Sequence, residues 1–124
     1  SIFELGEEQS GLELIEEAIE EAKKTGEIGP EGLARATWGH YYGRANPSEW
    51  QKAEESILTG MRILEGLELK GYIPRVNLLA GKMLIDVGQL DKAKGYITQA
   101  ESSFREMNCD YWANKAQSVL DQIE

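Results

Sequence analysis

Apolar residues in this chain recur with the period of an α-helix, and the pattern returns further along the sequence. Between positions 53 and 67, apolar or small residues fall at i, i+4, i+7, i+11 and i+14, the stripe of an amphipathic helix. The same stripe follows 40 residues later. The matched pairs are Ala53 with Ala93, Ile57 with Ile97, Gly60 with Ala100, Leu64 with Phe104, Leu67 with Met107 and Tyr72 with Trp112.

A matching helix precedes each stripe, so the repeating unit is a pair of helices. At an offset of 42, Trp38-Gly39 and Tyr42 align with Ala80-Gly81 and Leu84. The two extra residues of the first copy lie around Asn46-Pro47. A weaker copy comes before both, because Ile15, Ile19 and Ala22 align with Ala53, Ile57 and Gly60 at an offset of 38. The pattern predicts a row of helical hairpins.

Residues that start and stop helices agree with this division. Asn46-Pro47-Ser48-Glu49 is typical of a helix start, with an N-cap, a proline and a glutamate three residues past the cap. Gly26, Gly71 and Gly88 fall where a helix end needs a left-handed residue, and Asp110 can cap the final helix. No strand-like alternation of useful length occurs. We therefore predict an all-α chain with helices over about 8–25, 30–44, 47–68, 73–87, 90–107 and 110–123.

The order of small and large residues in the clearest copy resembles the tetratricopeptide-repeat family. The matching positions are Ala80-Gly81, Leu84, Gly88, Ala93, Ile97 and Ala100. Small residues at 81, 93 and 100 would let two antiparallel helices approach closely, and large residues at 84 and 97 would fill the seam between hairpins. The resemblance implies an α–α superhelix, a right-handed stack of antiparallel hairpins.

The other copies depart from that family pattern. The earlier copy keeps Gly39 and Ile57 but has Gly60 where alanine is usual, and the 40-residue period exceeds the family's ~34. Longer repeats of this kind resemble those of large bacterial multidomain signalling proteins, and the segment 100–112 resembles the end of arrays attached to nucleotide cyclases and ATPase regulators. We divide the chain into a degenerate half repeat (8–29, with 2–6 as the last turn of its missing first helix), repeats at 30–71 and 72–109, and a capping helix at 110–124.

Charge and composition exclude several classes of partner. Residues 1–27 hold nine glutamates against two lysines, within a chain of net charge −9. No cluster of cations suggests nucleic acid or an anionic membrane surface, and no apolar run approaches the ~20 residues of a membrane span. A single cysteine favours a reducing, cytoplasmic location. Because the chain begins at Ser1, we expect it to be part of a larger signalling or regulatory protein.

Residues that usually carry chemistry are sparse. His40 is the only histidine, so a zinc site of the usual ligands cannot be assembled, and a surface or groove histidine is favoured over a catalytic one. Cys109 has no base within sequence reach and is interpreted as a structural thiol. The pairs Glu16-Glu17 and Glu20-Glu21 are interpreted as a solvated acidic face rather than a metal site. We expect no metal, no cofactor and no enzymatic activity.

The family resemblance also implies a binding groove lined by the first helix of each hairpin. Its basic residues would suit an acidic or carboxylate-bearing peptide, although ordinary solvated charges explain them equally well. The family's carboxylate-clamp pattern is not reproduced, so binding of chaperone tails is not implied. Groove positions are Leu33, Ala36, His40, Gly43, Arg44, Arg75, Leu78, Lys82, Ile85, Asp86, Lys115, Ser118 and Gln122. Those expected to contact a partner are His40, Arg44, Arg75, Leu78, Lys82, Ile85, Lys115 and Gln122.

Three functions remain open from the sequence. The favoured one is a protein-binding scaffold that holds a peptide or protein in the groove. The second is an array acting in cis, which would pack against or dimerise a nucleotide cyclase or ATPase regulator. The third is a small enzyme or ligand-binding protein that uses His40 with Tyr41 and Arg44, and it predicts an enclosed pocket around His40.

Overall fold

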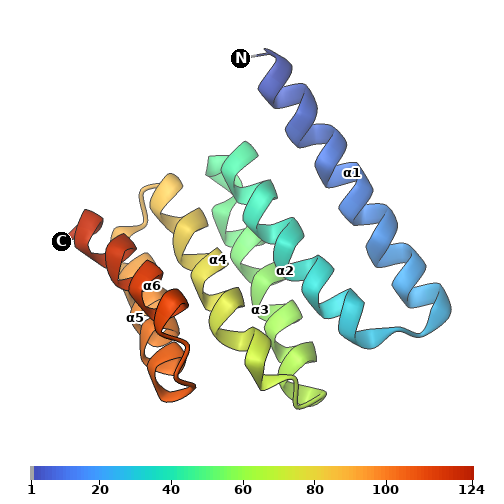
Figure 1. The fold of residues 1–124 in the computed structure, drawn as a ribbon. Helices are drawn as coiled ribbons and strands as arrows, with labels where there is room; N and C mark the ends of the chain where they lie inside the picture. The colour runs from blue at the N-terminus through green and yellow to red at the C-terminus, as the bar shows by residue number, and fades with distance from the viewer. Residues whose placement is uncertain (1) are drawn as a thin grey trace.

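Helices pack as antiparallel pairs along the whole chain (Figure 1). The computed structural model describes residues 2–124, with side chains from Gln9 onward. Within that range six α-helices form, so the predicted all-α class is confirmed. They are α1 (Ile2–Thr25), α2 (Ile28–Ala45), α3 (Trp50–Gly66), α4 (Ile73–Asp86), α5 (Leu90–Glu106) and α6 (Asp110–Ile123), with short 3₁₀ turns η1 (Pro47–Glu49) before α3 and η2 (Lys70–Tyr72) before α4.

The helix ends lie close to the predicted ones except at the N-terminus. From α2 onward each boundary falls within a few residues of its prediction, and the first turn of the predicted 47–68 helix is the 3₁₀ turn η1. The segment 2–6 was expected to close a separate helix, and this is wrong because α1 runs unbroken from Ile2 to Thr25. Gly6 and Gly11 lower helix propensity but do not end the helix.

Two of the three predicted turn glycines adopt the left-handed conformation. Gly26, directly after α1, has φ of 74°, and Gly88, two residues after the end of α4, has φ of 84°. The prediction for Gly71 is wrong, because Gly71 lies inside η2 and the left-handed residue after α3 is Glu68, with φ of 59°. The amide of Leu69 then donates to the carbonyl oxygen of Leu64 at 2.9 Å, the six-to-one bond of a Schellman turn.

The predicted side-chain caps are not formed. Asn46 is the N-cap residue of η1 and Pro47 follows it as predicted, but the Asn46 side chain makes no cap bond. Its Nδ2 donates back to the carbonyl oxygen of Tyr42 at 3.2 Å and so satisfies the end of α2. The N-cap of α6 is Cys109 rather than Asp110, and it makes no side-chain cap bond. Asp110 instead occupies the first turn, where its charge favours the positive end of the helix dipole.

Small residues at the helix interfaces allow the close packing that the sequence predicts. Ala93 and Ala100 have no exposed surface. In the first hairpin, a Cβ added to Gly60 would lie 2.3 Å from the carbonyl oxygen of Gly32, and one added to Gly39 would lie 2.5 Å from that of Ala53. The backbones of α2 and α3 are therefore in direct contact.

The first helix of each hairpin lies on one side of the molecule. α2, α4 and α6 run in the same direction along that side, and α3 and α5 lie behind them (Figure 1). We refer to this surface as the α2–α4–α6 face. On the opposite side, Glu54 of α3 accepts a hydrogen bond from Tyr96 of α5 at 2.9 Å and pairs with Lys92 at 3.2 Å, which ties the two hairpins together.

α1 stands at one end of the row and packs on α2 (Figure 1). Three residues, Leu12, Ile19 and Ala22, bury its apolar stripe. The indole N–H of Trp38 in α2 also donates to Glu16 of α1 at 3.0 Å. The opposite side of α1, which carries Glu13, Glu17 and Glu21, is exposed to solvent.

Candidate functional site

One hollow on the α2–α4–α6 face brings together residues from three helices. It has a volume of about 360 Å³ and is open to solvent. Five of the eight predicted contact residues line it, together with Asp86 and Val119. The five are His40 and Arg44 from α2, Lys82 and Ile85 from α4, and Gln122 from α6.

His40 forms the floor of this hollow, at the junction of α2 and α4. Only 7% of the residue is exposed, and its Nδ1 lies 3.0 Å from the carbonyl oxygen of Leu79. Because a carbonyl can only accept, Nδ1 carries the proton and Nε2 is left as an acceptor. Burial, together with the charge of Arg44, lowers the pKa of His40, whereas the bond to Leu79 opposes this shift. His40 is therefore neutral at physiological pH.

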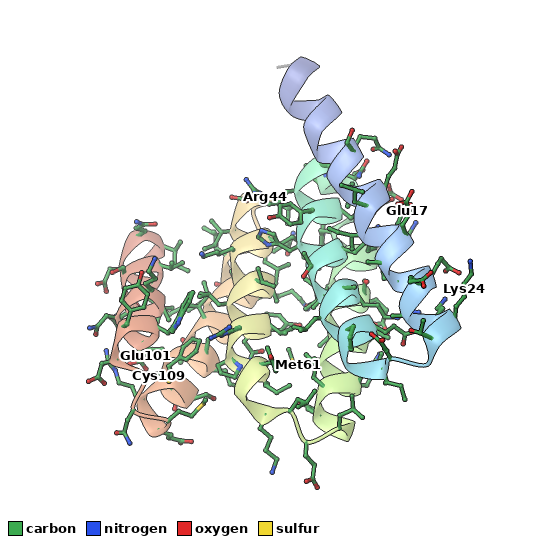
Figure 2. The ribbon with its side chains drawn as sticks, turned by 45° about the vertical axis from the view of Figure 1, so that its right-hand side comes forward. Glu17, Lys24, Arg44, Met61, Glu101 and Cys109 are labelled. Carbon is green, nitrogen blue, oxygen red and sulfur yellow. The ribbon has the colours of Figure 1, made fainter. Side chains whose placement is uncertain are left out.

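The charges around His40 are partly neutralised. Nε of Arg44 lies 2.8 Å from a carboxylate oxygen of Asp86, so these two groups form an ion pair across α2 and α4 (Figure 2 labels Arg44). Lys82 is exposed, and among the side chains that the structure describes no carboxylate lies within ion-pairing distance of its Nζ. Lys82 is thus the cation of the hollow available to a ligand.

A second group of cations lies nearer the start of α4 and α6, beside two aromatic rings. The guanidinium carbon of Arg75 lies 5.5 Å from the ring centroid of Trp112. Nζ of Lys115 lies 5.0 Å from the ring of Tyr111 and 5.8 Å from that of Trp112. Such cation–π contacts hold both charges over the face while leaving them exposed. Arg75 and Lys115 are therefore brought together, but at a distance along the helices from the hollow.

Some predicted groove positions lie inside the molecule. Leu78 is 4% exposed and belongs to the hydrophobic core, so it does not present its side chain on the face. Ala36 is fully buried, and Gly43 is buried where a Cβ would lie 2.6 Å from Met83. Ser118 is exposed and Leu33 is half-buried. The accessible part of the face is consequently narrower and more polar than the predicted set.

A second hollow, which the sequence does not predict, lies where α1, α2 and α3 meet. Its volume is about 410 Å³, and its lining includes Trp38 and Arg35. Among the side chains from Gln9 onward, Nε of Arg35 has no hydrogen-bond partner although it is buried, and the guanidinium lies 3.7 Å from Glu31. The sequence contains an indole N–H donor at Trp38 and acidic acceptors at Glu16 and Glu17, which could have suggested a contact between these helices. Only the folded chain shows that Glu16 accepts the bond from Trp38.

The described residues offer little for catalysis or metal binding. Among them, no group of three or more His, Cys, Asp or Glu side chains is arranged to hold a metal ion. Cys109 is a free, half-buried thiol whose Sγ lies 3.8 Å from the carbonyl oxygen of Met107. The helices described here are also too short or too polar to cross a lipid bilayer. The exposed cations of the α2–α4–α6 face could bind negatively charged groups.

Comparisons with known proteins give no relative. No protein-family model matches the sequence. No curated protein and no solved structure matches the chain significantly.

Proposed function

We propose that this chain is a non-catalytic protein-interaction scaffold, whose α2–α4–α6 face binds an acidic segment of a peptide or protein. The observation that carries this proposal is the placement of three exposed cations on one face of a chain of net charge −9. Arg75 and Lys115 lie over aromatic rings, and Lys82 lines the hollow beside His40. Carboxylates are the natural partners of such cations.

The fold supports the same proposal. Antiparallel hairpins that repeat along the chain, with small residues at their interfaces, are consistent with a right-handed superhelix of the tetratricopeptide type. In such a stack, the first helix of each hairpin contributes to a shared binding surface. We further propose that the array regulates or recruits a larger signalling protein in this way.

The shape of the hollow favours a protein partner over a small substrate. A site for a small molecule usually encloses most of its ligand's surface. Here the hollow around His40 is open, and Arg44 is already paired with Asp86. A neutral His40 that donates from Nδ1 to Leu79 is accounted for by its role in joining α2 to α4.

A defined acidic probe tests this function. We expect a short fluorescein-labelled oligoglutamate peptide to bind the full chain, with binding measured by fluorescence anisotropy. Replacing Arg75 and Lys82 with glutamate should weaken binding at least about tenfold, because two attractive contacts become repulsive. An oligoglutamine peptide of the same length should not bind.

The control variant reverses one arginine and one lysine elsewhere on the protein. Arg62 of α3 and Lys94 of α5 lie off the α2–α4–α6 face and make exposed ion pairs with Glu55 and Glu124, and Arg62 also donates to Thr59. Their replacement by glutamate changes the net charge by the same amount and should leave binding nearly unchanged. Equal losses in both variants would show that only net charge matters, and the proposed site would then be wrong.

A further inference from the structure

Three cations and one glutamine of the α2–α4–α6 face form a ladder with a regular spacing. Arg75 and Lys82 are seven residues apart on α4, as are Lys115 and Gln122 on α6. Seven residues are two helical turns, which correspond to about 10.5 Å along the axis. The face thus presents two polar rungs, one at Arg75 and Lys115 and the other at Lys82 and Gln122. A partner must place its negative charges with the same repeat.

α1 carries a ladder of matching period and opposite charge. Glu13 and Glu20 are also seven residues apart, and Glu17 lies between them on the same side of the helix. These residues, with Glu16, Glu21 and Lys24, line one shallow depression that only α1 contributes to. Figure 2 shows Glu17 and Lys24 at the outer edge of the molecule. Among the side chains that the structure describes, Glu16 accepts a hydrogen bond from Trp38 of α2 and Glu20 pairs with the exposed Lys23 at 3.4 Å, whereas Glu13, Glu17 and Glu21 form no ion pair.

The buried stripe of α1 leaves this acidic side free for a second molecule. Leu12, Ile19 and Ala22 are buried on the side of α1 that packs on α2, whereas Glu13, Glu17 and Glu21 are exposed. Glu16 and Glu20 lie at the edge, where they also line the hollow shared with α2. Leu14, which borders them, is 65% exposed. Tyr111, which lies beside Lys115 on the α2–α4–α6 face, is 66% exposed. Both surfaces therefore offer apolar as well as charged contacts.

We infer that the acidic side of α1 in one copy of this chain docks on the α2–α4–α6 face of a second copy. Glu13 and Glu20 then lie against Arg75 and Lys82, because the two ladders share one period. This inference rests on the proposed function of the face and names its occupant. The contact joins different surfaces of the two copies. If each copy docks its α1 on the face of the other, a closed dimer forms; if each docks on a further copy, a linear assembly forms.

Local attraction has to overcome the mutual repulsion of two copies of net charge −9. At physiological ionic strength the Debye length is about 8 Å, so distant charges are largely screened while paired side chains still attract. The interface is therefore of the weak, transient class. Raising the salt concentration to about 1 M, where the Debye length is about 3 Å, should weaken it.

Charge reversal in the 124-residue chain tests this contact. Sedimentation equilibrium should show reversible association of the unaltered protein. The face variant (R75E with K82E) and the α1 variant (E13K with E20K) should each have an apparent dissociation constant raised at least about tenfold. Mixing these two variants should restore association, because each then presents the charge that the other lacks. The control variant R62E with K94E should associate like the unaltered protein.

Each alternative result contradicts the inference in a recognisable way. A strictly monomeric protein, with no association in the mixture of variants, overturns it. Association that survives both reversals places the interface elsewhere and also overturns it. All four charges are on exposed side chains, and unchanged circular dichroism spectra would confirm that the variants fold.

The oligoglutamate probe separates this inference from the proposed function. If the peptide binds the unaltered protein and not the R75E/K82E variant while the protein stays monomeric, the face binds acidic segments but α1 is not its partner. If the peptide also fails to bind, both proposals are wrong.

Discussion

The two hairpins, α2 with α3 and α4 with α5, follow one sequence pattern but bring their helices together differently. In the first, glycines on both helices put backbone against backbone: Gly60 meets the carbonyl oxygen of Gly32, and Gly39 meets that of Ala53. In the second, Gly81 faces the side chain of Ile97 instead. A side chain can change its rotamer, whereas a packed backbone cannot move alone. The first hairpin should therefore be much less tolerant of added volume.

The largest effect is expected from Gly60→Ala in the first hairpin. Its new Cβ would lie 2.3 Å from a backbone oxygen and 2.9 Å from the backbone nitrogen of Ala36, so α2 and α3 must separate. We expect a loss of about 3 kcal/mol or more in the free energy of unfolding, even after the ~1 kcal/mol that alanine adds to helix propensity. Chemical denaturation, combined with hydrogen exchange resolved by helix, measures this loss.

Gly81→Ala in the second hairpin should cost less. The added Cβ would meet Cγ1 of Ile97 at 2.3 Å, so that side chain must shift, whereas the nearest backbone atom, the carbonyl oxygen of Ala93, lies 3.3 Å away. We expect a net loss of about 1–2 kcal/mol. Gly95→Ala serves as the control, since a Cβ there has open space and should stabilise α5 by up to about 1 kcal/mol. Equal losses for Gly60→Ala and Gly81→Ala would remove the distinction between the hairpins.

The two hairpins should also differ in their response to pH. The position that aligns with His40 at the 42-residue offset is Lys82, which is exposed. Burial lowers the pKa of His40 below its ordinary value of 6.5, with the charges of Arg44 and Lys82 acting in the same direction; the bond to Leu79 and the charge of Asp86 oppose them. Below about pH 6.5 the unfolded chain therefore binds a proton more readily than the folded one.

It follows that the contribution of His40 to stability is complete above pH 6.5 and is lost progressively as the pH falls. Since His40 is the only histidine, denaturation between pH 5 and 7 isolates its effect. His40→Gln should flatten this dependence, and hydrogen exchange should show the loss first where α2 meets α4. An unchanged slope in the variant would contradict the assignment.

The smallest effects are expected in the turns that follow α3 and α5. Glu68 and Asn108 both adopt left-handed conformations, with φ of 59° and 58°. Glycine takes up this conformation without steric cost, and asparagine tolerates it better than glutamate. We expect Glu68→Gly to raise the melting temperature through a gain of about 0.5–1 kcal/mol, and Asn108→Gly to give less. A larger gain at Asn108 would show that strain does not set the order.

Periodic features of the fold could be predicted from the sequence, and unique contacts could not. The stripe shared by residues 53–67 and 93–107 was sufficient to place the helices, because burial of one face repeats along a helix. The left-handed Glu68 was missed since no residue preference marks it; the turn's hydrogen bonds impose it. The start of α1 was missed because its first turns carry no stripe that matches a later copy.

The candidate site was predicted in part for the same reason. Helix period places His40, Lys82 and Gln122 on one face, and they do line one hollow. Whether a position on that face is buried depends on the neighbouring hairpin, which fills the space beside Leu78 and Gly43. The pairing of Arg44 with Asp86 likewise depends on the register between α2 and α4. These contacts depend on how neighbouring helices pack, so the sequence of one helix alone does not determine them.

The turn after α3 and the turn after α5 have the same geometry, and this makes the molecule extensible. In each, the left-handed residue and the one after it donate to the same carbonyls: Glu65 and Leu64 in the first turn, Arg105 and Phe104 in the second. If residues 70–109 were duplicated and the copy inserted between Cys109 and Asp110, the copy would follow the turn after α5. That turn has the same hydrogen bonds as the turn that precedes residue 70 in the native chain. The array could thus lengthen by tandem duplication, and each added unit would extend the α2–α4–α6 face through a turn of the same geometry.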